Sequence, residues 1–202
     1  MPNFKVIYFP YKGLAEPIRF IFSYAGRSFD DQRLIEKFWP EYKLTTPYGQ
    51  LPMLIVDRRK VAQSVAISRF LAKQFGIAGK NDWEAMHIDA TVDTIHDIRL
   101  KLASFHYEKD ETRKAEKRKE AEESLAYFLE RLDAQVKEHG GFFYGGTISW
   151  ADLTFVALLD YFNYMYKSDL IANYENLKQL REKILKLPKI KTWLEKRPDS
   201  EY

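Results

Sequence analysis

The chain has 202 residues, 46% of them hydrophobic and 30% charged, and its 32 basic and 29 acidic side chains leave a net charge of only +3. This balance excludes the strong positive field with which proteins bind nucleic acid or membranes, so we expect neither as a partner. The sequence has no cysteine, which excludes disulfides, thiolate metal sites and catalysis by a protein thiol. Any reactive sulfur therefore has to arrive with a ligand.

The first residues favour a β-strand over a signal peptide. Lys5 interrupts the short apolar run, and no cleavage pattern follows it. No apolar run approaches the roughly 20 residues that a membrane-spanning helix requires. We therefore expect a cytoplasmic protein.

The N-terminal part of the sequence mixes strand and helix patterns. These patterns predict a strand over 4–9, a helix over 18–25 that ends at Gly26, strands over 29–34 and 53–56, a short strand after Asp57, and an amphipathic helix with the apolar stripe Ile67, Phe70, Leu71 and Phe75. A loop rich in proline and aromatic residues is expected over 38–49. The order predicts an α/β domain over residues 1–78.

The sequence after the break at 76–82 has helical spacing throughout. It predicts helices over 83–107, 111–138, 149–166, 177–187 and 189–196. The clearest start signal is Ser149 as an N-cap, with Asp152 three residues later and Ile148 packing against Leu153. We expect an all-helical second domain over residues 82–202.

Tyr8 stands at the end of the first predicted strand. A phenol stays protonated at neutral pH and can donate a hydrogen bond to a thiolate, which is the nucleophilic form of a thiol. Such a bond, worth about 1.5–3 kcal/mol, lowers the pKa of a ligand thiol by roughly two units. An isolated strand tyrosine is more often a packing residue, so Tyr8 alone leaves both interpretations open.

Two further segments can bind a small peptide. Proline makes its predecessor extended, so the backbone of Leu51 before Pro52 can pair with a ligand backbone. Gln63 and Ser64 precede a helix, where free N–H groups and the Ser64 hydroxyl suit a carboxylate. A plain loop proline and an ordinary N-cap are the common alternatives for either segment alone.

Together with Trp39, Lys43 and the turn Gly49-Gln50-Leu51-Pro52, these motifs resemble the sigma class of glutathione transferases over essentially the whole chain. The resemblance implies a thioredoxin-like βαβαββα domain followed by a helical domain, with glutathione as co-substrate and a homodimer as the assembly. It implies conjugation of glutathione to hydrophobic electrophiles, or reduction of lipid peroxides.

The resemblance also assigns roles to residues, with Tyr8 as the catalytic residue. The implied glutathione-binding residues are Tyr8, Trp39, Lys43, Gly49, Gln50, Leu51, Pro52, Gln63, Ser64 and Asp97 of the partner subunit. The Leu51–Pro52 bond is expected to be cis, as in the family. We place the acceptor pocket between the domains, against Phe9, Leu14, Phe105 and Tyr107.

Three positions depart from the prostaglandin D synthase branch of this class. Leu14 and Gln50 stand where that branch has arginine and lysine, so we expect glutathione affinity to rest more on backbone bonds, Trp39 and Lys43. Ser104 stands where that branch has an aromatic residue, which argues against prostaglandin isomerase specificity. The alternatives to a transferase are a noncatalytic ligand-binding or crystallin-like relative and a prostaglandin D synthase-type isomerase.

Asp89, Asp93 and Asp97 follow one another at helical spacing beside His96. The prostaglandin D synthase branch holds magnesium at corresponding positions, but His96 replaces a carboxylate here. We expect a solvated acidic stripe and no metal site, with Mg²⁺ at Asp93 and Asp97, or a dimer interface, as the alternatives.

Overall fold

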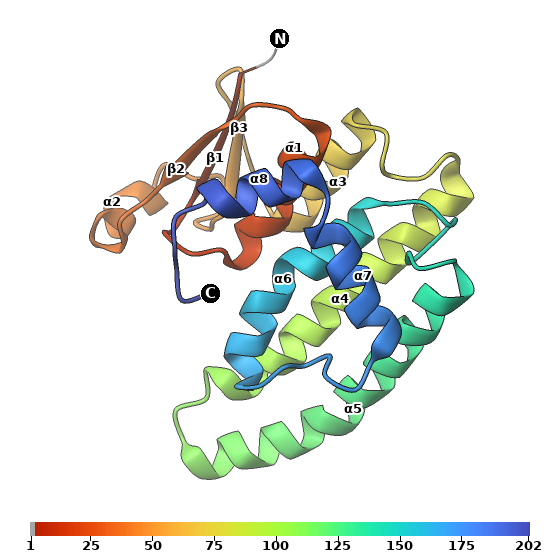
Figure 1. Cartoon of the computed structure of the whole chain (residues 1–202). Helices are drawn as coiled ribbons and strands as arrows, with labels where there is room; N and C mark the ends of the chain where they lie inside the picture. The colour runs from red at the N-terminus through yellow and green to blue at the C-terminus, as the bar shows by residue number, and fades with distance from the viewer. Residues whose placement is uncertain (1–2) are drawn as a thin grey trace.

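The computed structural model describes residues 3–202 and places a small mixed sheet beside a bundle of helices (Figure 1). The elements are β1 Phe4–Tyr8, η1 Gly13–Ala15, α1 Glu16–Ala25, β2 Asp30–Arg33, η2 Glu36–Phe38, α2 Trp39–Lys43, β3 Met53–Val56, β4 Arg59–Ala62, α3 Ser64–Gln74, α4 Asp82–His106, α5 Glu111–Glu138, α6 Trp150–Tyr166, α7 Glu175–Leu185 and α8 Pro188–Lys196. This order confirms the predicted α/β part followed by helices. The expected loop over 38–49 is wrong at its start, because the short helix α2 forms there with Pro40 in its first turn.

The four strands form one sheet in the order β2-β1-β3-β4. β1 pairs parallel with β2 through the α1 crossover and antiparallel with β3, and β3 pairs antiparallel with β4. Asp57 and Arg58 both have positive φ angles, 47° and 77°, which suits the tight hairpin between β3 and β4. This is the predicted thioredoxin-like arrangement, with Tyr8 at the end of a central strand.

α6 is the central helix of the second part and begins where the sequence predicts. The backbone N–H and the hydroxyl of Ser149 donate to the Asp152 carboxylate at 2.7 and 2.8 Å, and the N–H of Phe143 donates to its other oxygen at 2.8 Å. Asp152 and the neighbouring Trp150 are fully buried. The capping box therefore sets the start of the helix, and its buried carboxylate joins α6 to the loop at Phe143.

The apolar core does not divide at the predicted domain boundary. One cluster runs from Phe4 and Phe22 in the first part to Trp150 and Phe162 in the second, and α1 packs against α6. The loop between α3 and α4 bends at Gly76 and Gly79, both with positive φ. The division into residues 1–78 and 82–202 stays a prediction.

One predicted core residue is wrong. Ile67 and Leu71 of α3 are buried, but Phe70 is 45% exposed. The buried residues of α3 are Ile67, Ser68, Leu71 and Ala72, and at about 100° per residue position 70 lies roughly 130° from the centre of the face that they form.

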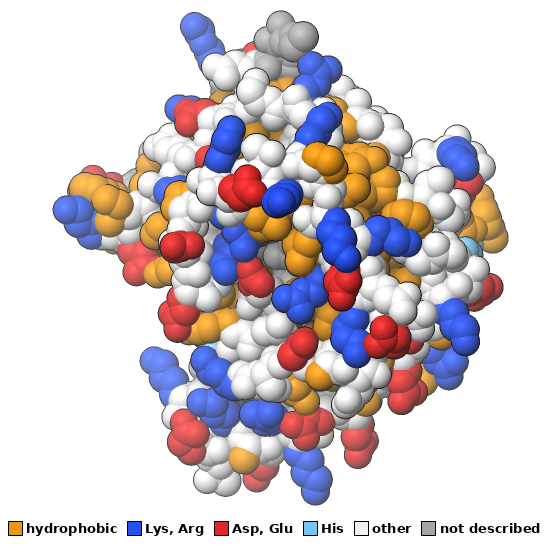
Figure 2. All heavy atoms as spheres, viewed as in Figure 1, with side chains coloured by type: hydrophobic (Ala, Val, Ile, Leu, Met, Phe, Trp, Pro, Cys, Tyr) orange, Lys and Arg blue, Asp and Glu red, His pale blue; other side chains and the backbone are white. Residues whose placement is uncertain are grey.

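The surface has no dominant charge on the face that Figure 2 shows, where basic and acidic side chains are interspersed. No helix within residues 3–202 is long and apolar enough to cross a bilayer.

Candidate active site

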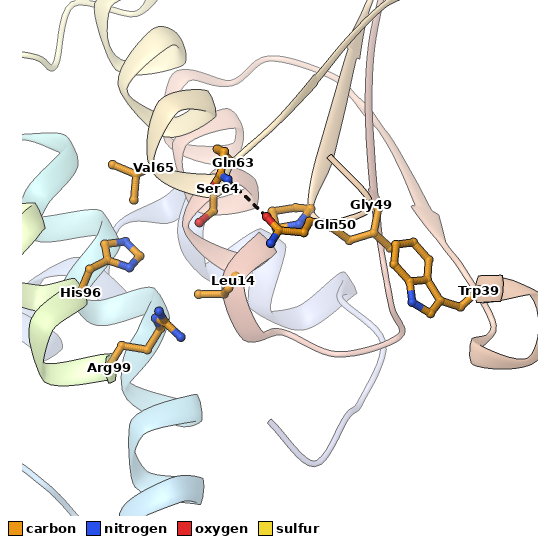
Figure 3. Close-up of a pocket in the computed structure, with 11 residues that line it drawn as sticks. Leu14, Trp39, Gly49, Gln50, Gln63, Ser64, Val65, His96 and Arg99 are labelled. Atoms are coloured by element: carbon orange, nitrogen blue, oxygen red, sulfur yellow. Dashed lines mark hydrogen bonds between the residues drawn. The ribbon is translucent and has the colours of Figure 1, made fainter. Parts of the chain in front are cut away.

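A cavity of about 620 Å³ lies where the first part of the chain faces α4 (Figure 3). Its lining residues are Leu14, Trp39, Gly49, Gln50, Leu51, Pro52, Gln63, Ser64, Val65, His96 and Arg99. They come from η1, α2, the turn before β3, the start of α3 and the middle of α4. The cavity thus brings together seven of the predicted glutathione-binding residues, from Trp39 to Ser64.

Tyr8 does not line this cavity but binds Leu14, which does. Its hydroxyl oxygen accepts a hydrogen bond from the N–H of Leu14 at 3.4 Å, and burial raises its pKa above the ordinary value of 10. The phenol is therefore protonated at neutral pH. Because the oxygen accepts from Leu14, the phenolic proton is free to be donated to a ligand.

The turn before β3, residues 49–52, lines the cavity. The Leu51–Pro52 peptide bond is cis, as expected, and Gly49 has a φ of 63°. A Cβ added to Gly49 would lie 3.0 Å from Cε of Lys43, so the stem of this exposed lysine packs beside the turn. Lys43 is thus near the cavity edge and does not line it.

The start of α3 has an unusual backbone. Gln63, not Ser64, is the N-cap, with a φ of 81°, and Ser64 is the first helical residue. Few residues other than glycine adopt such a φ, and strained conformations of this kind concentrate at functional sites. The Gln63 amide donates to the Gln50 side chain at 3.2 Å (Figure 3), which ties α3 to the turn before β3.

The four residues expected to form the acceptor pocket are not gathered by either of the two cavities described here, one of about 620 Å³ and one of about 320 Å³. Only Leu14 lines the 620 Å³ cavity. Phe9 packs edge-on against Trp39 at 5.4 Å, and Phe105 is buried in the wall of a separate cavity of about 320 Å³ with Arg118. Tyr107 is 57% exposed, and its hydroxyl shares a 2.8 Å hydrogen bond with Tyr161.

His96 and Arg99 line the cavity, and the sequence did not mark them as part of this site. Burial, followed by the charge of Arg99, lowers the pKa of His96 to about 4. Within residues 3–202, Nε of Arg99 is buried without a hydrogen-bond partner. The one available signal was their spacing of three residues, which puts both on the same face of α4.

The acidic stripe of α4 has a basic partner that the sequence did not indicate. Arg69 of α3 binds Asp89 at 2.8 Å and lies 3.9 Å from Asp93, while Asp97 is exposed. In the described part of the chain, no group of three or more His, Asp or Glu side chains gathers as metal ligands.

Two family models match the chain and together span most of it. The N-terminal domain of glutathione S-transferases matches residues 4–73, and the C-terminal domain of the same family matches residues 96–197.

Full-length relatives agree with these matches. The chain is 44% identical to a glutathione S-transferase of Anopheles gambiae, with 100% of both chains covered. It is 40% identical to glutathione S-transferase S1 of Drosophila melanogaster, over 98% of this chain and 80% of that protein. Hematopoietic prostaglandin D synthase of Homo sapiens is 33% identical over 99% of each chain.

A solved structure supports the same relationship. Prostaglandin synthase D of Nilaparvata lugens superposes with a TM-score of 0.93 and 40% identity, covering 98% of this chain and 100% of that chain. The chain therefore belongs to the glutathione S-transferase family and is a sigma-like glutathione S-transferase.

Proposed function

We propose that Tyr8 donates its phenolic proton in a hydrogen bond to the glutathione sulfur and so holds that sulfur as a thiolate. The observation that carries this proposal is the hydrogen bond from the Leu14 N–H to the Tyr8 oxygen, which leaves the phenolic proton free. The raised pKa of Tyr8, caused by burial, keeps that proton on the phenol at neutral pH. A donor of this kind stabilises the charged form of its partner and lowers the pKa of the thiol.

The cavity can orient glutathione through three groups of residues. The N-terminus of α3 with Ser64 suits the γ-glutamyl carboxylate, and the backbone of Leu51 before the cis Pro52 suits the cysteinyl peptide. Trp39 and Lys43 suit the glycyl end. Arg99 lines the same space, and its buried Nε has no hydrogen-bond partner in the described residues 3–202, so its charge adds a favourable field for an anion.

The reaction that follows is nucleophilic attack on a hydrophobic electrophile. The thiolate sulfur forms a bond to the electrophilic carbon, and the bond to the leaving group breaks with its electron pair. Tyr8 keeps its proton throughout and acts by favouring the thiolate before attack.

The test is the ultraviolet absorbance of bound glutathione thiolate against pH, for wild type and Tyr8→Phe. We expect the wild-type midpoint to lie about two units below that of free glutathione and the variant to lose this shift. At pH 6.5, kcat/KM with an aryl halide should then fall about 10- to 100-fold. Equal midpoints in the two proteins would show that Tyr8 is only a packing residue.

The electrophile class needs a separate test, because several of the similar proteins are named prostaglandin D synthase or prostaglandin synthase D. We propose conjugation of hydrophobic electrophiles as the main activity, with lipid peroxide reduction as a second one. Ser104 lies on α4, where an aromatic residue marks the isomerase branch. Product analysis with an aryl halide, a lipid hydroperoxide and a prostaglandin endoperoxide separates conjugation, peroxide reduction and isomerisation. If prostaglandin D formed with the highest kcat/KM of the three products, conjugation would not be the main activity.

We also propose that the enzyme is a homodimer in which Asp97 of the partner subunit binds the glutathione amine. Large apolar side chains are exposed on α3 and α4, including Phe70 at 45%, Met86 at 50% and Trp83 at 65%.

Light scattering should give twice the mass of 23.9 kDa. Asp97→Asn should raise the glutathione Kd about tenfold, since it removes one charged hydrogen bond. A monomer with unchanged affinity in the variant would refute the arrangement.

We propose a cytoplasmic location, because a chain without cysteine has no disulfide to form in an oxidising compartment. Cell fractionation tests this, and recovery of the protein in a membrane or secreted fraction would contradict it.

A further inference from the structure

A further cavity, of about 350 Å³, lies between α5 and the segment that joins α6 to α7. In Figure 1 this segment runs along α5, at the end of the molecule away from the sheet. Leu125, Leu129 and Leu170 line the cavity and are only 2–5% exposed, so they form its apolar floor. The cavity shares no lining residue with the 620 Å³ cavity of the candidate active site and is therefore a separate space.

The wall opposite α5 is held in place by its own hydrogen bonds. The Asn163 side chain accepts from the N–H of Leu170 at 2.9 Å. The Asp169 carboxylate accepts from the N–H of Ile171 at 3.2 Å, and the Ile171 carbonyl accepts from the N–H of Tyr174 at 3.0 Å. Leu170 and Ile171 are also buried. The cavity is therefore preformed, and a ligand does not have to order this wall on binding.

The rim of the cavity carries negative charge. Glu122 and Asp169 line it, and none of its described lining residues is Lys, Arg or His. Glu122 forms an ion pair with Arg118 at 3.0 Å, whereas Asp169 is exposed and has no ion pair among residues 3–202. The cation Lys178 feels the charge of Asp169, but it is paired with Glu175 at 2.8 Å, and that hydrogen bond is the main cause of its raised pKa. Asp169 is therefore the carboxylate left for a ligand.

Two tyrosine rings also line the cavity. The ring of Tyr166 already attracts a cation of the protein, because the guanidinium carbon of Arg118 lies over it at 5.2 Å from the ring centroid. Tyr174 is partly buried and has no cation over its ring in the described part of the chain. Burial, followed by the charge of Glu130, raises the pKa of Tyr174, so its ring is neutral at neutral pH.

We propose that this cavity, here called the α5 cavity, binds a small organic cation, that is, a protonated or quaternary amine with an apolar body. The charged nitrogen lies beside Asp169 and against the Tyr174 ring, and the apolar body lies on the leucine floor. Aromatic rings beside a carboxylate are the usual means of recognising such cations. The proposal concerns binding alone, so it goes beyond the transferase function and does not rest on it.

The probe for this site is phenyltrimethylammonium, and its neutral isostere tert-butylbenzene is the matched control ligand. Titration of the isotope-labelled protein, followed by the NMR shifts of its backbone amides, locates each ligand and gives its Kd. We expect the cation to shift the amides of residues 122–129 and 168–174, which enclose the α5 cavity. Shifts confined to other parts of the chain would overturn the proposal.

Asp169→Asn tests the charge, because the amide keeps the oxygen that binds the N–H of Ile171. The Kd for phenyltrimethylammonium should rise about fivefold, as expected for the loss of one exposed charge at about 4 Å, and the Kd for tert-butylbenzene should not change. Glu123→Gln removes the same charge from an exposed position of α5 that does not line the cavity. It should leave both Kd values unchanged, and equal losses in the two variants would show a general effect of net charge and no site.

The tyrosine wall is tested by a pair of changes at one position. Tyr174→Leu removes the aromatic face and should raise the Kd for phenyltrimethylammonium about 3- to 30-fold. Tyr174→Phe keeps the ring and should bind like wild type. Thermal unfolding and the glutathione Kd of each variant should be close to those of wild type, because the α5 cavity is separate from the active site. If Tyr174→Leu bound the cation as tightly as Tyr174→Phe, the ring would not recognise cations and the proposal would be wrong.

Discussion

The Tyr8 hydroxyl is held by the backbone that follows its own strand. Gly13 has a φ of 41°, and a Cβ added there would lie 2.9 Å from the Tyr8 oxygen. Gly13→Ala should therefore displace the phenol from the glutathione sulfur. We expect kcat/KM to fall about tenfold or more, because donor placement at a reacting atom has to be accurate to within about 1 Å.

Gly76 offers a matched control for this change. Its φ is 74°, but an added Cβ meets no atom within 4 Å. Both alanine variants should lose about 1 kcal/mol of stability from backbone strain, and only Gly13→Ala should also lose the low thiolate pKa. An unchanged thiolate midpoint in Gly13→Ala would contradict the contact argument.

His96 should make the stability of the protein depend on pH. Burial lowers its pKa from 6.5 to about 4 in the folded state, so between these values the unfolded chain binds more protons. Its contribution to stability is present above pH 6.5 and is lost as the pH falls towards 4.

This pH dependence is measured by denaturant unfolding of wild type and His96→Gln at several pH values. Between pH 7 and pH 4, the wild type should lose about 2–3 kcal/mol more than the variant. The difference between the two proteins isolates His96 from Asp152, whose pKa is raised to about 6 by burial and acts in the opposite direction. Parallel pH profiles would exclude His96 as the source.

At the scale of elements, Asp152 connects the start of α6 to the preceding loop. Asp152→Ala leaves the buried N–H groups of Phe143 and Ser149 without their acceptor. We expect a loss of about 3–5 kcal/mol in the free energy of unfolding, since each orphaned buried donor costs about 1–3 kcal/mol. Glu116→Ala on the exposed face of α5 should stay within about 0.5 kcal/mol of wild type in the same urea titration.

The elements were largely predictable because their signals are local. The Ser149–Asp152 capping box and the left-handed Gly26 that ends α1 are readable without tertiary information. The direction in which each helix side chain points was less predictable. Phe105 stands six residues after Arg99, which at about 100° per residue puts it roughly 240° around α4 and away from the cavity.

The site was predictable only where the resemblance supplied motifs. Trp39, the turn at 49–52 and Gln63-Ser64 were identified in this way, and the cavity gathers them. Arg99 carries no motif, and its place in the cavity depends on how α4 packs against the first part of the chain. The positive φ of Gln63 likewise has no sequence signal, since glutamine rarely adopts it.

At the scale of the whole molecule, one buried carboxylate joins the two halves. Glu16 of α1 is fully buried and accepts from Arg19 at 3.0 Å, from Trp193 of α8 at 2.8 Å and from Arg197 at 2.9 Å. These last two partners stand 177 and 181 residues away along the chain, a separation that no local pattern can predict.

Glu16→Gln should weaken both halves together. The amide keeps the size of the side chain but removes the negative charge that pairs with the buried Arg19, which retains only its 2.9 Å ion pair with Asp31, so we expect a cost of about 1.5–3 kcal/mol. Because the apolar core is also continuous, fluorescence from Trp39 in the first part and Trp150 in the second should move to the same lower urea midpoint. Trp193 donates to Glu16 and is kept, and Trp83→Phe combined with either Trp150→Phe or Trp39→Phe gives two backgrounds, each with one of these two reporters. If the Trp39 midpoint fell while that of Trp150 did not, the two predicted domains would be independent folding units, and the shared core would not couple them.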